Sequence, residues 1–238
     1  MKNQYFADVN DFRKYGLLRS LVDSSEMKAA ICWMLTENDT RTDGKFIDYL
    51  NHPEKWRRYD PDLFDMLASC ITNQSNRSVK WAKENQLIPS AVYFAESLCN
   101  EQEKRQRYFA EFDTIAADSD LVFFDPDNGI ETKSVPFGHQ GSNKYIYWPE
   151  LINTFQSGKS ILVYQHFIRV KRELFIQQLA DRFCEYLPIS ETFSLTTANV
   201  LFLLIPQPHH QKYLEKKCEE ISTNWYSQIQ VNKHRSAQ

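Results

Sequence analysis

The sequence lacks closely spaced cysteines, long apolar runs and a large excess of charge of either sign. Its five cysteines are far apart, odd in number and never form a C-x-x-C pair, which argues against a disulfide framework and against a zinc site. Reduced thiols are typical of a cytoplasmic protein, and we expect that location. No apolar run reaches the roughly 18 residues that span a bilayer, and the first residues hold no apolar signal segment. We therefore predict no membrane insertion.

Length and charge set broad limits. A chain of 238 residues with 42% hydrophobic content can bury a full core. We predict a single α/β domain over residues 1–238, with an α-helical insertion at about 46–89, where prolines interrupt an irregular apolar pattern. The net charge of −3 neither supports nor excludes a nucleic-acid partner, because a local basic face can exist under a near-neutral total.

The chain is organised around an apolar strand at 121–124 that runs into a polar loop at 125–131. Ligands of open α/β sheets bind just outside the carboxyl ends of such strands. Pro126 fixes the turn and Gly129 permits a positive φ, so the loop would hold its polar side chains in a defined geometry. Those side chains are Asp125, Asp127 and Asn128. The alternative is an ordinary turn, since the same residue types are common turn formers.

The other segments alternate between strand and helix patterns. The expected helices are Asn10–Val22, Glu101–Ala117, a helix opening near Pro149 and stopping at Gly158, Lys171–Leu187 and His210–Trp225; the expected strands are Ala29–Leu35, Ala91–Ala95, Ser160–Tyr164, Phe193–Thr197, Val200–Ile205 and Ser227–Val231. This order predicts a doubly wound, mainly parallel sheet with helices on both faces and an antiparallel C-terminal hairpin. The first helix carries Arg13, Lys14 and Arg19, and we expect most of that basic face to be solvated.

Two further strand ends would join the site. Ala29–Leu35 ends in a second polar loop, Thr36–Lys45, and Ser160–Tyr164 delivers Gln165 and His166. His166 would serve as a general base or bind phosphate together with Arg169; the alternative is a histidine that caps the next helix. The connection through Gly138 and Gly141 is long enough for a mobile flap, whose aromatic residues would stack on a ligand. These aromatic residues are Phe137, Tyr145 and Tyr147.

The layout resembles class I S-adenosylmethionine-dependent methyltransferases, which end in a helix and a hairpin after parallel βα units. In the amino-methylating members an apolar strand ends in a D-P-P-Y or N-P-P-Y motif, whose acid or amide accepts a hydrogen bond from the target amine. Here Asp125 and Pro126 match that motif, whereas the second proline and the aromatic residue are absent. The resemblance implies that Asp125 accepts the target amine, and a base would have to be extruded or single-stranded to reach it.

The N-terminal helix before the first strand is similar to that of ribosomal RNA adenine-N6 methyltransferases, and the D-P-D-N-G sequence is similar to that of a bacterial family of unknown function. Such methyltransferases bind the cofactor with a glycine-rich loop after the first strand, whereas the loop here holds only Gly44. The resemblance implies S-adenosylmethionine as cofactor. The residues that it places at the cofactor are Thr36, Asp43, Gly44 and Glu96, the last at the ribose.

A metal-dependent nuclease or phosphodiesterase is the alternative chemistry. Asp125, Asp127 and Glu131 are three hard oxygen donors suited to Mg²⁺, and acids of the first loop, Glu37, Asp39 or Asp43, would approach them. Glu131 and Lys133 have the local E-x-K form of restriction-type nucleases. Their spacing from Asp125 is too short for the usual arrangement on adjacent strands, so we rank this alternative second.

A methyltransferase-like binding module without activity is a third possibility, since the first loop is poor in glycine. We predict a methyltransferase-like protein that acts on an amine of a nucleic-acid base. Its predicted catalytic residues are Asp125, Asp127, Asn128 and His166, and its predicted substrate-binding residues are Gln165, Arg169 and Lys133.

Overall fold

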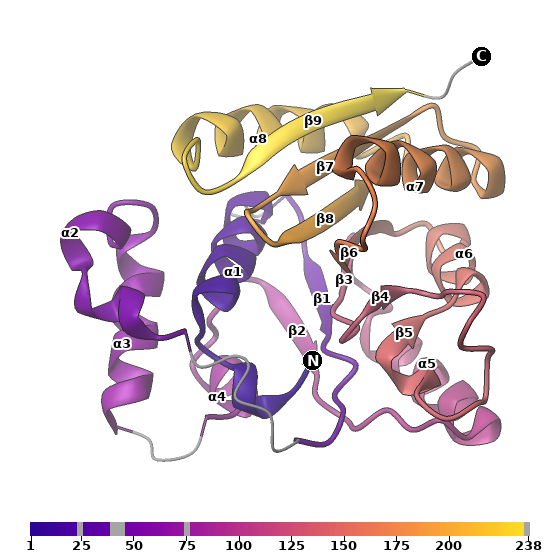
Figure 1. Cartoon of the computed structure of the whole chain (residues 1–238), viewed down its shortest axis with the longest axis horizontal. Coiled ribbons are helices and arrows are strands. Elements are labelled where there is room, and N and C mark those ends of the chain that lie inside the picture. The colour runs from indigo at the N-terminus through magenta and orange to yellow at the C-terminus, as the bar shows by residue number, and fades with distance from the viewer. Residues whose placement is uncertain (23–25, 39–45, 74–76, 236–238) are drawn as a thin grey trace.

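A computed structural model describes residues 1–22, 26–38, 46–73 and 77–235. Figure 1 shows a mixed α/β structure with one large central sheet. The helices are α1 (Val9–Leu21), α2 (Pro53–Trp56), α3 (Pro61–Asn73), α4 (Lys80–Glu84), α5 (Gln102–Ile115), α6 (Trp148–Gln156), α7 (Arg172–Tyr186) and α8 (Gln211–Asn224). The strands are β1 (Ala29–Cys32), β2 (Ala91–Phe94), β3 (Leu121–Phe124), β4 (Gly129–Ile130), β5 (Tyr145–Ile146), β6 (Ser160–His166), β7 (Glu191–Thr196), β8 (Val200–Ile205) and β9 (Gln230–Arg235).

The central sheet has seven strands in the order β2-β1-β3-β6-β8-β7-β9. The first four run parallel to one another, whereas the pairs β6–β8, β8–β7 and β7–β9 are antiparallel. Both β1 and β3 are buried at every position, as expected for parallel strands covered on two faces. The prediction of a mainly parallel sheet with an antiparallel C-terminal hairpin is therefore confirmed, and β9 adds a further antiparallel strand at the edge.

Helices cover both faces of this sheet. The side chains of Ile31 and Phe123 pack in a core with α1, α3 and α8, whereas the neighbouring Cys32 and Phe124 pack against α5, α6 and α7 on the other face. This follows from the alternation of side chains along a strand. Each face therefore buries a separate apolar core.

The N-cap of helix α1 lies two residues before Asn10, the first residue of the Asn10-Asp11 cap predicted from the sequence. Asp8 is its N-cap, and the Asp8 carboxylate accepts hydrogen bonds from the backbone nitrogens of Asn10 (2.8 Å) and Asp11 (2.9 Å). Asp11 consequently lies in the first turn, and Lys14 follows one turn later on the same side. Contrary to the prediction of a solvated basic face, Lys14 is only 3% exposed.

Several strand boundaries differ from the sequence prediction. β1 ends at Cys32 rather than Leu35, because Met34 adopts a positive φ of 46° and turns the chain out of the ladder. β6 runs on to His166, through pairing with β8. The last strand begins at Gln230 rather than Ser227, after Ile229 has been buried in the core.

The connection predicted to be a mobile flap is instead fastened to α5. It contains the parallel pair β4 and β5, and the fully buried Arg105 donates to the backbone carbonyls of Ser142 (3.0 Å) and Tyr145 (2.7 Å). Arg105 also pairs with Glu150 of α6 at 2.6 Å. These bonds hold the connection against the body of the protein.

Within the described part of the chain, no helix combines the length and the apolar character needed to cross a bilayer.

Candidate functional site

A cavity of about 380 Å³ lies at the carboxyl edge of the parallel strands. The chain passes from β1 to β2 on one side of β1 and then returns to β3 on its other side, so this edge contains the switch point, between β1 and β3, at which open α/β sheets bind ligands. Side chains from the N-terminal segment, from α1, from the loop after β3 and from the end of β6 line the cavity. Those that matter most for its chemistry are Tyr5, Asp11, Lys14, Asp125, Tyr164 and His166.

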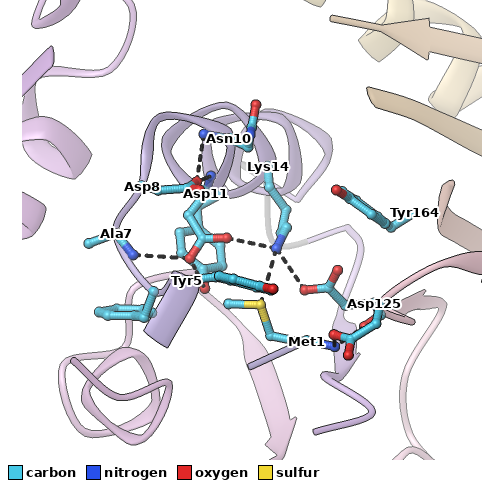
Figure 2. Close-up of polar contacts among 12 residues, drawn as sticks. Met1, Tyr5, Ala7, Asp8, Asn10, Asp11, Lys14, Asp125 and Tyr164 are labelled. Carbon is cyan, nitrogen blue, oxygen red and sulfur yellow. Dashed lines mark hydrogen bonds and ion pairs between the residues drawn. The ribbon is translucent and has the colours of Figure 1, made fainter. Parts of the chain in front are cut away.

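Lys14 lies between two carboxylates at the floor of this cavity (Figure 2). Its ammonium nitrogen is 2.7 Å from Asp11 Oδ1 and 2.7 Å from Asp125 Oδ2, and all three side chains are less than 5% exposed. Asp125 comes from the loop after β3, 111 residues away in sequence. The cluster therefore ties the N-terminal helix to the loop that the sequence identified.

The two carboxylates keep Lys14 charged. Burial by itself would lower its pKa, but Asp11 and Asp125 outweigh this and leave the pKa of Lys14 above its ordinary value. A lysine that stays protonated donates hydrogen bonds and does not act as a base or a nucleophile. Its role is to orient the two carboxylates.

The pKa of Asp11 is raised. Burial is the largest cause, and together with the charges of Asp8 and Asp125 it outweighs the opposing effect of Lys14 and brings the pKa to about 6. The second oxygen of Asp11 accepts from the Ala7 backbone nitrogen (3.0 Å) and from Tyr15 Oη (3.3 Å). The carboxyl group is therefore held in place while its charge changes near pH 6.

Asp127 is bonded on both of its oxygens. Oδ2 accepts from Thr36 Oγ1 at 2.6 Å, and Oδ1 is 2.7 Å from the amine of Met1, which also donates to the Asp125 carbonyl oxygen at 2.9 Å. Burial alone would raise the pKa of Asp127, but these partners hold it below its ordinary value. Thr36, predicted at the cofactor, is thus a partner of Asp127.

Tyr164 and His166 form the β6 side of the cavity. The Tyr164 ring lies 5.4 Å from the ammonium of Lys14, and its hydroxyl is 3.3 Å from His166 Nε2. Desolvation lowers the pKa of His166, against the charges of Asp125 and Asp127. The imidazole is therefore neutral at pH 7, and its exposed position at the rim lets it accept a proton.

Gln165 holds the loop after β3 in position. Its Oε1 accepts from the Ile130 backbone nitrogen (2.8 Å), and its Nε2 donates to the carbonyls of Asn128 (3.3 Å) and His166 (2.8 Å). Gly129 has a φ of +109°, and a Cβ there would collide with the Gln165 carboxamide. Gln165 was predicted to bind substrate; the structure directs its side chain to the loop backbone and gives it a positioning role.

The structure gathers some of the predicted site residues and separates others. Asp125, Asp127, Asn128 and His166 all line the cavity. Glu96 instead lines a separate open hollow beside β2, and Glu131 Oε1 accepts from the Trp148 backbone nitrogen at the start of α6. Lys133 and Arg169 are exposed and lie outside the cavity lining. Asp39, Asp43 and Gly44 lie outside the described residues.

The sequence interpretation missed Asp11, Lys14 and Tyr164. A signal for the first two was present: Asp11, Lys14 and Leu18 recur at the spacing of one helix face, and Leu18 belongs to the apolar stripe. A lysine on such a stripe must be paired if it is buried. The expected stacking residues Phe137, Tyr145 and Tyr147 do not line the cavity, whereas Tyr5, Phe46 and Tyr164 do.

Among the described residues, no three His, Cys, Asp or Glu side chains come together in a way that could hold a metal ion. The proposed Mg²⁺ ligands Asp125, Asp127 and Glu131 each have another partner in the structure.

Among solved structures, this chain bears a distant likeness to a bacterial protein. No family model and no curated protein matches the chain. The crystal structure of protein LPL1258 from Legionella pneumophila str. Philadelphia 1, of the family DUF519, aligns with 98% of this chain and 98% of its own at 12% identity, with a TM-score of 0.43. A similarity this low does not establish a shared fold or function.

Proposed function

We propose that this chain is a Rossmann-like methyltransferase that transfers a methyl group from S-adenosylmethionine to an amine of a nucleic-acid base in the cytoplasm. The observation that carries the proposal is the placement of Asp125 and Asp127, on the Asp125-Pro126 loop, in one cavity at the switch point of the sheet. The insertion of β8 between β6 and β7 also agrees with the C-terminal hairpin of class I methyltransferases.

The charges that line the cavity are balanced: Asp8, Asp11, Asp125 and Asp127 face Lys2, Lys14, Lys144 and the amine of Met1. S-adenosylmethionine likewise carries charges of both signs, a sulfonium and an amine together with a carboxylate. The volume of about 380 Å³ is at the lower end of small-molecule sites. When bound, the cofactor would supply an electrophilic methyl group. Asp43 and Gly44, predicted to hold it, lie outside the described residues.

Different residues of the cavity would bind the target amine, take up its proton and hold its base. Asp125 would accept a hydrogen bond from the target amine, and Lys14 fixes the direction in which its carboxylate points. His166, neutral at pH 7, would take up the proton that the amine releases. Tyr5 and Phe46 line the cavity and would offer aromatic faces to an extruded base.

A metal-dependent nuclease remains the second candidate, and a binding module without activity is the third. The nuclease would need Asp125 to leave Lys14 and Glu131 to leave the start of α6 before a cation could bind. The binding module would keep the cavity but transfer no methyl group.

Calorimetric titration with S-adenosylmethionine, followed by Mg²⁺ and Mn²⁺, tests the proposal, together with transfer of a radiolabelled methyl group to RNA and single-stranded DNA. We expect cofactor binding and methyl transfer in the wild type. Asp125→Asn should abolish transfer. It also removes one of the two buried ion pairs of Lys14, so the melting temperature should fall, while the remaining pair with Asp11 keeps the protein folded. The exposed control Asp118→Asn should leave both transfer and melting temperature intact. Metal binding that is lost in Asp125→Asn, without cofactor binding, would instead favour the nuclease. Cofactor binding without transfer to any nucleic acid would favour the binding module.

A further inference from the structure

Figure 1 shows the loop that joins β6 to α7. This loop and the first turn of α7 present positive charge and apolar side chains together. We call residues 167–174, which include the first three residues of α7, the basic loop. Residues 168–174 are all exposed, and the apolar side chains of Ile168, Val170 and Leu174 are 50%, 45% and 53% exposed. The cations of the loop are Arg169, Lys171 and Arg172, against the single acid Glu173.

The basic loop begins at the rim of the candidate site. His166 lines the cavity, and Phe167 follows it directly. Arg169 is three residues beyond His166, so at most about 11 Å of chain separates their α carbons. A ligand that entered the cavity and extended along this edge of the sheet would therefore meet the basic loop first.

A second hollow, of about 690 Å³, lies beside the basic loop. Phe167 and Arg172 form one part of its lining, and the end of β7 and the start of β9 contribute Thr197 and Gln230. Residue pairing places both strand ends at the same edge of the sheet as His166. Tyr226, which also lines this hollow, is 69% exposed.

The side chains around this hollow suit a single strand of nucleic acid. The Arg172 guanidinium lies 4.5 Å from the centre of the Phe167 ring and donates to the Ala198 carbonyl at 2.7 Å, so its position is fixed. Proteins that bind single strands combine cations for the phosphates with aromatic faces on which bases stack. Tyr226 provides such a face, and Arg169 and Lys171 provide the charge.

We propose that the basic loop and the adjoining hollow bind the single-stranded nucleic acid that flanks the target base. The inference rests on the proposed function in one respect, namely that the cavity receives a base. Exposed apolar side chains next to cations would also suit an anionic membrane surface. The hollow, whose lining begins one residue beyond the cavity-lining His166, and its exposed tyrosine favour the nucleic acid.

Fluorescence anisotropy with a short labelled single-stranded RNA, measured over a series of salt concentrations, tests the inference. In the double variant Arg169→Ala/Lys171→Ala, the slope of log affinity against log salt should fall by about 1.4, since each phosphate contact on a single strand contributes about 0.7. The control pair Arg107→Ala/Lys212→Ala removes two exposed cations from α5 and α8 and should leave the slope unchanged.

Stacking has its own test. Tyr226→Ala should weaken RNA binding about tenfold, and Tyr226→Phe should restore it, because a phenyl face stacks as well as a phenol. Equal losses in both variants would exclude stacking at this position.

The inference and the proposed function fail in different ways. Binding of S-adenosylmethionine is measured in the same preparations. If the cofactor binds but the basic-loop variant keeps the affinity and salt slope of the wild type, the inference is wrong and the proposed function stands. If RNA binding depends on the basic loop but no cofactor binds, the inference stands and methyl transfer fails. Binding to vesicles of phosphatidylserine and phosphatidylcholine, with no binding to RNA, would overturn the inference.

Discussion

Two polar clusters lie at opposite edges of the same sheet, and only one has the character of a site. At the carboxyl edge Lys14 joins Asp11 and Asp125 in a cavity. At the amino edge Ser160 Oγ is 2.9 Å from His210 Nδ1, and His210 Nε2 is 3.8 Å from Asp120 Oδ1. The second cluster has the residue types of a serine hydrolase triad.

Access and hydrogen bonding separate the two clusters. Ser160 is fully buried, and its hydroxyl oxygen accepts from the Gln207 backbone nitrogen at 2.9 Å. A nucleophile must reach its substrate, and this oxygen cannot. The comparison teaches that residue types alone do not define a site; the strand end on which they lie and the space in front of them do.

The largest effect is expected at Lys14. Lys14→Met leaves the Asp11 and Asp125 carboxylates buried without their shared partner, which should cost about 3–5 kcal/mol of the free energy of unfolding. Urea denaturation measures this. The exposed control Lys212→Met should change it by less than about 0.5 kcal/mol. Similar values for the two variants would show that the cluster at the carboxyl edge is not held by its ion pairs.

Gly129 tests whether the loop after β3 is held by Gln165. Gly129→Ala combines a positive φ with a collision against the carboxamide and should cost about 3 kcal/mol. Gly158 also has a positive φ, of 86°, but a Cβ there meets nothing within 4 Å, so Gly158→Ala should cost about 1 kcal/mol. Thermal unfolding of the two variants compares these costs. Equal shifts in melting temperature would mean that the Gln165 side chain moves aside to make room for the added Cβ.

Ser160→Ala addresses the amino edge directly. We expect a loss of about 1–2 kcal/mol, because the Gln207 backbone nitrogen and His210 lose a partner. Methyl transfer and RNA binding should be unchanged. If Ser160→Ala instead lost activity without losing stability, the cluster at the amino edge would be functional, contrary to the comparison above.

The smallest effect concerns pH. The pKa of Asp11 in the folded protein is about 6, above its ordinary value of 3.8, so between these values the folded state binds more protons than the unfolded state. The contribution of Asp11 to stability is therefore greatest below about pH 4 and falls as the pH rises to about 6. Asp11→Asn should remove this fall from the profile of melting temperature against pH. The exposed control Asp118→Asn should retain it, and a profile of Asp11→Asn parallel to the wild type would contradict the assignment.

The order of strands and helices follows from the sequence by itself. Apolar runs such as Leu121–Phe124 and the helical stripe of 12, 15 and 18 are local patterns, and their periods report secondary structure directly. The turn chemistry of Pro126 and Gly129 likewise marks the loop that bears Asp125. These features predicted the mainly parallel sheet and one side of the cavity.

Only the tertiary structure decided which charges are buried and what they meet. A lysine on an amphipathic helix can extend its ammonium to water or bury it, and Lys14 is buried because Asp125, 111 residues away, reaches it. The connection after β4 is held in place because Arg105 of another helix binds its carbonyls. Burial of a charge depends on partners brought together by folding, and local periodicity carries no information about residues so far apart in the chain.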